Sequence, residues 1–123
     1  MALKLMYITN DPIVAAIAEK NGVDRIWVDL ETLGKEKRQM GMNTVKSKHT
    51  MEDVSQVRKA IKRAQLLVRI NPLHEGTQRE VDEVVARGAD IIMLPMFETE
   101  QDAQCFVDIV AGRAKVLLLA ETM

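Results

Sequence analysis

The sequence predicts an α/β fold built from parallel βα units, and three observations support this prediction. Five short apolar runs recur along the chain, helical patterns with start and stop signals separate them, and the runs are nearly continuous rather than alternating. Parallel sheets of this kind carry their chemistry at the carboxyl ends of their strands. The 123 residues suffice for one domain, spanning residues 1–123, but not for two.

The first two expected strands cover residues 3–8 and 25–30. Between them, Asn10-Asp11-Pro12 provides a cap and a first-turn proline for a helix that Gly22 ends. Residues 32–49 follow as a polar, Lys-rich stretch without clear periodicity, which predicts a solvated loop. The apolar face of the first helix is formed by Ile13, Ala16 and Ile17.

The third, fourth and fifth strands are expected at residues 66–70, 90–94 and 115–120. Thr50 to Asp53 resembles a capping box, and Thr77 to Glu80 is expected to cap the helix after the third strand. Helical spacing of apolar residues marks the three remaining helices. These residues are Val54, Val57 and Ile61, then Val81, Val84 and Val85, then Ala103, Phe106, Val107 and Val110.

Two folds accommodate five such units. One is a part of a TIM-type (β/α)₈ barrel with about five of its eight strands, since a whole barrel takes about 250 residues. The alternative is a five-stranded, doubly wound, flavodoxin-like domain. A receiver domain would need a phosphoacceptor Asp at the end of the third strand, where this chain has Arg69-Ile70-Asn71, and the chain has no G-x-G-x-x-G motif for a dinucleotide.

Composition excludes several classes of function. A net charge of −1 and an aromatic content of 3% argue against a nucleic-acid-binding surface. No run approaches the roughly 20 apolar residues that span a membrane. No long apolar region precedes Asp11-Pro12, so we expect no secretory signal. A single cysteine, Cys105, excludes an internal disulfide, so we expect a cytoplasmic protein.

Polar residues follow the apolar runs at the points where the strands should end. The carboxyl ends of parallel strands meet at one edge of the sheet, so we expect these residues to share one site. Asp29 and Glu31 share a face if their strand continues and diverge if it bends at Leu30. The candidate residues are Asp29, Glu31, Arg69, Asn71, Pro95 and Glu121.

Four motifs around these residues resemble, in order and spacing, one known family. They are Asp29-Leu30-Glu31, Val68-Arg69-Ile70-Asn71, Ile92-Met93-Leu94-Pro95-Met96 and Leu119-Ala120-Glu121-Thr122. The family comprises the citrate lyase β-subunit and the 2-keto-3-deoxy-acid, pyruvate-dependent class II aldolases, and the resemblance covers roughly residues 20–123. It implies the N-terminal part of a metal-dependent barrel that makes or breaks a carbon–carbon bond next to an enolate.

The resemblance also implies roles for individual residues. Arg69 would hold the carboxylate and enolate oxygen of a pyruvate-like ligand, with Asn71 and Pro95 beside it, and Asp29 and Glu31 would assist catalysis. Glu121 would bind Mg²⁺ or Mn²⁺, whose second carboxylate ligand would lie beyond Met123. A hard cation and a planar guanidinium both suit an oxygen that gains negative charge.

The sequence departs from the family pattern after Asp29-Leu30-Glu31. Aldolase members place His where this chain has Thr32, and His74 is one candidate to replace it. His49 is expected at the surface, and Cys105 is expected to be an inert packing residue. The motif around Pro95 is aldolase-like, whereas the motif around Arg69 is lyase-like, so the branch stays open.

The expected function is therefore a metal-dependent carbon–carbon lyase or aldolase, acting on a 2-oxo acid or acyl-thioester through an enolate. We expect the chain to be truncated and inactive alone. The alternative is a non-enzymatic α/β module that kept the family fold and binds a partner or a small acid. For Arg69 itself, the alternative to ligand binding is a structural ion pair with Glu31 or Glu121. A barrel sheet of five strands has two unpaired edges, so a homo-oligomer is expected, without nucleic-acid or membrane partners.

Overall fold

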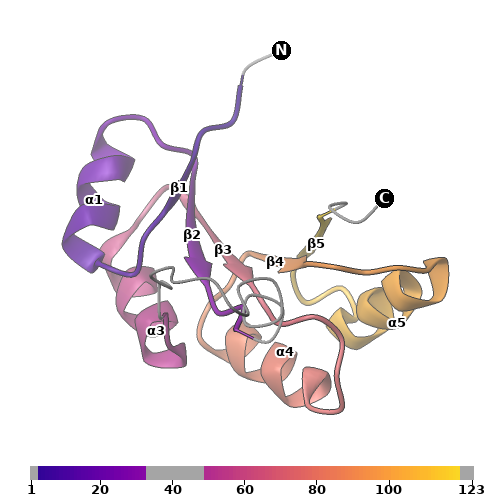
Figure 1. Cartoon of the computed structure of the whole chain (residues 1–123). Helices are drawn as coiled ribbons and strands as arrows, with labels where there is room; N and C mark the ends of the chain where they lie inside the picture. The colour runs from indigo at the N-terminus through magenta and orange to yellow at the C-terminus, as the bar shows by residue number, and fades with distance from the viewer. Residues whose placement is uncertain (1–2, 33–48, 120–123) are drawn as a thin grey trace, which may run out of the picture.

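The computed structural model describes residues 3–32 and 49–119 (Figure 1). Strands and helices alternate along these residues, and no helix among them has the length and apolar character to cross a membrane. The strands are β1 (Met6–Ile8), β2 (Arg25–Asp29), β3 (Gln65–Arg69), β4 (Ile91–Leu94) and β5 (Lys115–Leu118). The helices are α1 (Pro12–Lys20), α3 (Met51–Ala60), α4 (Thr77–Ala86) and α5 (Glu100–Val110).

The strands form one parallel sheet in the order β1-β2-β3-β4-β5. Each strand pairs with the next one along the chain, which is the order of a βα barrel. A doubly wound sheet would instead reverse its strand order at a switch point. The sequential order confirms the prediction of a partial barrel and excludes the flavodoxin-like alternative.

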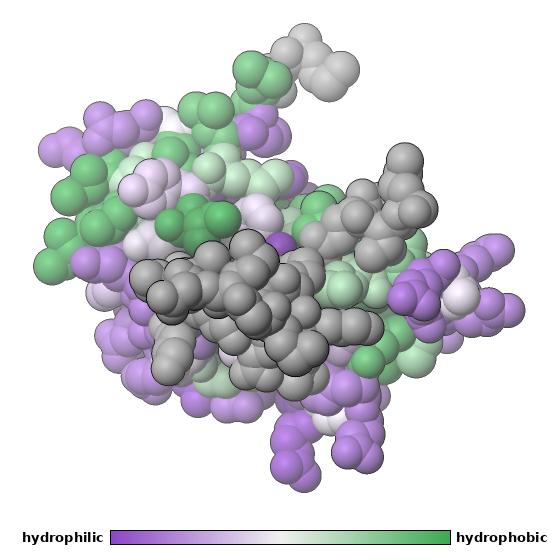
Figure 2. Space-filling view, viewed as in Figure 1, coloured by the Kyte–Doolittle hydropathy of each residue, from purple (hydrophilic) through white to green (hydrophobic). Residues whose placement is uncertain are grey.

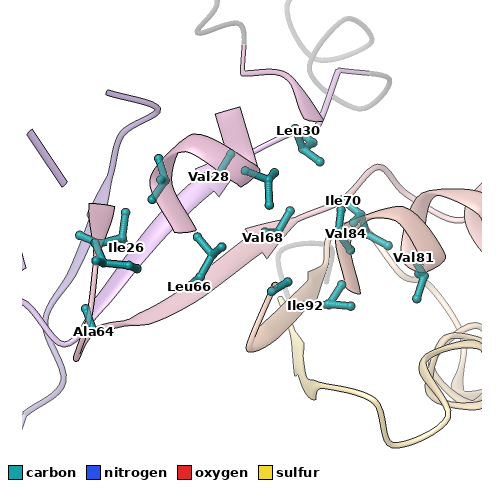
Figure 3. Packing of buried hydrophobic residues seen from close by; sticks show 14 of the residues in the cluster. Ile26, Val28, Leu30, Ala64, Leu66, Val68, Ile70, Val81, Val84 and Ile92 are labelled. Carbon is teal, nitrogen blue, oxygen red and sulfur yellow. The ribbon is translucent and has the colours of Figure 1, made fainter. Parts of the chain in front are cut away.

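The helices cover one face of the sheet and fan around its outside (Figure 1). Val28, Val68 and Ile92 point from neighbouring strands toward this helical layer, where Val81 and Val84 of α4 meet the sheet (Figure 3). These side chains are fully buried, and such burial is worth about 1.5–3 kcal/mol per large aliphatic residue. The main core therefore lies between the sheet and its helices.

The opposite face of the sheet carries a second, smaller apolar cluster. Leu67, Ile91 and Met93 are buried there, with Trp27 and Leu117 packed against them. Strand register aligns Trp27 with Leu67 and Leu67 with Ile91, so these side chains share one face. Two residues further along β2 and β3, the same face carries the polar residues of the candidate site.

Local capping explains where most helices begin. The Asp11 side chain accepts from the amides of Ile13 and Val14 at the start of α1, with Pro12 in its first turn. The capping box predicted at Thr50 and Asp53 is confirmed for α3. A second box, Thr99 with Asp102, starts α5 and was not predicted.

The predicted cap of α4 was wrong. Gly76 is the N-cap residue and makes no side-chain capping bond, while Thr77 is the first helical residue. The Thr77 hydroxyl accepts instead from the His74 amide, and Glu80 binds Asn71 instead of closing a capping box. The cap fails because both partners are engaged in tertiary or turn contacts.

The open edge of the sheet at β1 is apolar. α1 packs on the core through Ala15 and Ala18, whereas Ile13 is 71% exposed and Ile17 is 57% exposed. Figure 2 shows green, hydrophobic surface over α1 and the strand beside it. The large exposed hydrophobic residues of this edge, called the β1 edge patch below, are Leu3, Leu5, Met6, Tyr7, Ile8, Ile13 and Ile17.

At the amino-terminal end of the sheet, Glu19 binds the backbone that leads into β3. Its carboxylate oxygen accepts hydrogen bonds from the amides of Lys62, Arg63 and Ala64 at 2.8, 2.6 and 2.7 Å. Desolvation raises the pKa of Glu19, but these three amides and the Arg63 charge outweigh it and lower the pKa below the ordinary value of 4.5. Glu19 thus ties the end of α1 to the start of β3.

Candidate functional site

Arg69 and Asp29 form a two-point ion pair at the carboxyl ends of β3 and β2. Arg69 Nε donates to Asp29 Oδ1 at 3.0 Å, and Arg69 Nη2 donates to Asp29 Oδ2 at 2.6 Å. The strand register places the two residues directly opposite each other. Their side chains are 12% and 4% exposed, so the pair is shielded from water and strongly oriented.

Trp27 lies against the same guanidinium. The Arg69 Cζ atom sits 5.0 Å from the centroid of the Trp27 ring. Trp27 precedes Asp29 by two residues and therefore points to the same face of β2. The ring supports the guanidinium through a cation–π contact while Asp29 holds its edge, so Arg69 has little freedom.

Glu31, two residues after the end of β2, lies beside this pair. Its side chain is 0% exposed, and its Oε1 atom lies 3.9 Å from Arg69 Nη2. The Glu31 amide donates to Asp29 Oδ1 at 3.1 Å. The structure therefore brings Asp29, Glu31 and Arg69 together, with two carboxyl groups facing one guanidinium.

Asn71 links three elements instead of standing apart at the strand end. Its backbone amide and Nδ2 donate to the two oxygens of Glu80 at 3.0 and 2.7 Å. Its Oδ1 accepts from the Thr32 amide at 2.7 Å and from the Thr32 hydroxyl at 3.3 Å. Glu80 thus orients Asn71, and Asn71 fixes the chain just after Glu31.

His49 lies at this end of the sheet, although the sequence suggested a surface position. It is half-buried, and its Nδ1 atom accepts a 2.8 Å hydrogen bond from the Asp29 amide. The signal that could have located it is the capping box at Thr50, because a helix that follows a strand begins near that strand's carboxyl end.

The remaining candidates are less central. His74 Nε2 lies 3.8 Å from Glu80 Oε1, so His74 adjoins the Asn71 contacts. Pro95 is buried directly after β4. Cys105 is exposed on α5 and not packed in the core, which corrects the sequence interpretation. Glu121 lies outside the described residues.

A divalent cation fits the donor chemistry of this site in part. Asp29 and Glu31 supply oxygen donors of the kind that Mg²⁺ prefers, and two carboxyl groups against one guanidinium leave an excess of acidic groups. Within residues 3–32 and 49–119, no group of three or more His, Cys, Asp or Glu residues could hold a metal ion.

Comparison with known families agrees with this arrangement. The family model described as HpcH/HpaI aldolase/citrate lyase matches residues 4–116. The chain belongs to this family. The match includes Asp29, Glu31, Arg69, Asn71 and Pro95, and it confirms the family resemblance. The fourth motif, residues 119–122, lies outside the matched residues. No curated protein matches the chain significantly.

Solved structures share the fold at low identity. An HpcH/HpaI aldolase from Desulfitobacterium hafniense DCB-2 has a TM-score of 0.63 and 16% identity, with 87% of this chain and 37% of that chain covered. A phosphonopyruvate hydrolase in complex with oxalate and Mg²⁺ has a TM-score of 0.64 and 15% identity, with 94% of this chain and 47% of that chain covered. A citrate synthase variant has a TM-score of 0.58 and 13% identity, covering 94% of this chain and 43% of that chain. The chain spans less than half of each of these structures.

Proposed function

We propose that this chain contributes the 2-oxo-acid-binding part of a carbon–carbon lyase of its family. The observation that carries the proposal is the Arg69 guanidinium, fixed by Asp29 on one edge and by Trp27 on one face. The enolate or carboxylate of a pyruvate-like compound, or an acyl-thioester enolate, suits this cation. The aldolase and lyase branches share this requirement.

The geometry of a guanidinium allows Arg69 to bind Asp29 and a substrate at the same time. Asp29 engages the edge formed by Nε and Nη2, and the edge formed by Nη1 and Nη2 has the same fork shape. In the proposal, the substrate carboxylate or enolate oxygen meets this second edge. Asp29 is then a positioning residue, because it sets the angle at which Arg69 presents that edge.

The chemical step in the aldolase branch is a retro-aldol cleavage. A base removes the proton of the substrate hydroxyl, the adjacent carbon–carbon bond breaks to release an aldehyde, and its electron pair becomes the pyruvate enolate. We assign the base to Glu31, which lies buried beside Arg69, and charge stabilisation to Arg69. Asn71 holds Thr32 and thereby the backbone next to Glu31. Pro95 would form part of the pocket wall.

Mg²⁺ or Mn²⁺, when bound, would withdraw charge from the same enolate oxygen. Glu121 would be the ligand from this chain, with a further carboxylate from outside it. Because Mg²⁺ gives up its water reluctantly, one carboxylate should hold it only weakly. We therefore propose that residues 1–123 alone bind metal weakly and are catalytically silent.

A binding module without catalysis is the second candidate. The observation that favours it is the closed Asp29–Arg69 pair, together with the lack of a three-ligand metal cluster in the described parts of the chain. A small carboxylic acid would still be recognised by Arg69 in that case. The two candidates differ in whether the bound acid is enolised.

We further propose a cytoplasmic homo-oligomer in which a second copy covers the β1 edge patch. The support is the unpaired edge of β1 and the apolar residues beside it. A two-fold axis would place the same apolar patch on both copies, so each patch would be covered by its own counterpart.

Isothermal titration with oxalate in millimolar Mg²⁺ tests the proposed function, because oxalate resembles the pyruvate enolate. We expect saturable binding that Arg69→Lys weakens at least about tenfold, since an ammonium cannot make a two-point contact. Arg79→Lys, on the exposed side of α4, is the matched control and should leave binding unchanged. Absence of oxalate binding by the wild-type chain would refute the proposal. Loss of pyruvate methyl protons into D₂O, measured on a longer protein that supplies the further carboxylate, would separate the enzyme from the binding module.

A further inference from the structure

A cavity of about 340 Å³ lies at the amino-terminal end of the sheet, at the opposite end from Arg69. Its lining comes from the end of α1, from residues 22–24 before β2, and from Arg63 and Ala64 before β3. The connections that supply it lie away from the arrowheads of β2 and β3 (Figure 1). Small-molecule sites begin at about 300 Å³, so the cavity can hold a compact ligand.

Two carboxylates of the cavity each bind the backbone through a single oxygen. Glu19 Oε2 accepts the amides of residues 62–64, and Asp24 Oδ2 accepts the Leu5 amide at 2.9 Å. Within residues 3–32 and 49–119, the other oxygens, Glu19 Oε1 and Asp24 Oδ1, form no hydrogen bond. Both carboxylates are thus held in place by the fold, and each has a second oxygen that can accept from a ligand.

Lys20 and Arg63 bring two positive charges to the same cavity. Both residues are exposed, and neither side chain forms an ion pair in the described parts of the chain. With Glu19 and Asp24, the lining carries two charges of each sign. A simple anion there meets two carboxylates and a metal ion meets two cations, whereas a ligand with both charges is attracted by both pairs.

The rest of the lining is small and apolar. Val23 and Ala64 contribute short aliphatic side chains, and Gly22 contributes none. A Cβ atom added to Gly22 would meet no other heavy atom of the described residues within 4 Å, so the space beside it is open. These residues suit a ligand whose uncharged part is short and apolar.

We propose that this cavity is a second ligand site, which binds a free α-amino acid with a small apolar side chain. The ammonium group of the ligand donates to Glu19 and Asp24, and its carboxylate lies against Lys20 and Arg63. The inference is independent of the proposed function, because the cavity and Arg69 lie at opposite ends of β3.

Two substitutions each remove one half of this recognition. Lys20→Gln removes an exposed cation, and Asp24→Asn removes a negative charge while its amide oxygen can still accept from Leu5. We expect each to weaken the binding of L-alanine at least about threefold. Arg79→Gln, on the exposed side of α4, removes one positive charge elsewhere and should leave this binding unchanged.

Backbone amide spectra of the full chain, titrated with L-alanine, test the inference directly. We expect saturable shifts that are largest at residues 19–24 and 62–64. Propionate, which lacks the ammonium group, and alaninamide, which lacks the carboxylate, should shift the same amides far less. These comparisons use the unsubstituted chain, so they do not depend on the stability of any variant. No saturable shift with L-alanine, shifts centred elsewhere, or an equal response to either analogue would overturn the inference.

Discussion

Asp29 and Arg69 lie opposite each other on β2 and β3 and join through two charged hydrogen bonds of 3.0 and 2.6 Å. The pair sits where the two strands end, on the face of the sheet that the helices leave uncovered. Its position follows from strand register alone, because residues aligned in a parallel ladder point the same way. The candidate site is built around this pair.

Breaking the pair should cost much of the stability of the chain. Asp29→Ala removes the two-point partner of the largely buried Arg69 charge, so we expect the free energy of unfolding to fall by roughly 3 kcal/mol. Urea denaturation measures the change. Asp108→Ala is the control, because Asp108 on α5 makes an exposed hydrogen bond with Gln104. Equal effects of the two substitutions would mean that the buried pair contributes no more than a surface contact.

The contact between Asn71 and Glu80 should behave as a coupled unit. Asn71→Asp places two carboxylates together, and Glu80→Gln places two amide donors together, so each should destabilise the chain by about 2 kcal/mol. The double variant can restore both bonds, because the new amide can accept from the residue 71 backbone and donate to the new carboxylate. We expect it to regain at least half of the summed loss in a double-mutant cycle. Strictly additive losses would show that the two groups do not interact in solution.

Stability should depend on pH through Glu19. Its pKa is lowered on folding, so its contribution is present above the ordinary value of 4.5 and is lost as the pH falls through the folded value. Glu19→Gln should therefore destabilise the chain by about 1–2 kcal/mol at pH 7 and by less under acid conditions. Chemical denaturation at both pH values gives the comparison, with the exposed Glu75→Gln as control. A destabilisation that stays constant on acidification would contradict this role.

Association of the chain should depend on the β1 edge patch. Ile13 is 71% exposed on α1, so Ile13→Lys should not disturb the monomer but should oppose its burial in an interface. Sedimentation at micromolar concentration should show an oligomer for the wild type and a shift toward monomer for the variant. Gln78→Lys, on the exposed side of α4, should leave the oligomer intact. A monomeric wild-type chain would contradict the proposed homo-oligomer.

The fold was accessible from sequence because its signals are local. Apolar runs, a first-turn proline and the capping box at Thr50 each involve residues within one or two turns. The strand-end rule is enough to group Asp29, Glu31 and Arg69 from the sequence alone. Their grouping needs only the direction of the strands, which is common to all parallel βα folds.

The remaining features depend on contacts that have no local signature. Asp29 and His49 are 20 residues apart, and Glu19 meets residues more than 40 positions away. The Thr77 cap failed because Glu80 has a better partner in Asn71, which periodicity cannot reveal. The sequence pattern identified the apolar face of α1 with Ile13 and Ile17. It could not predict that these side chains are exposed, because their exposure follows from the open edge of the sheet.

The most direct test is a map of backbone amide shifts during titration of the full chain with oxalate in Mg²⁺. A cavity of about 340 Å³ lies at the opposite end of the sheet and is lined in part by Gly22, Asp24 and Arg63. It is the alternative place at which oxalate could bind in the same experiment. We expect saturable shifts that are largest at residues 29–31 and 69–71. Shifts centred on that cavity, or no saturable shifts at all, would contradict the placement of the acid at Arg69.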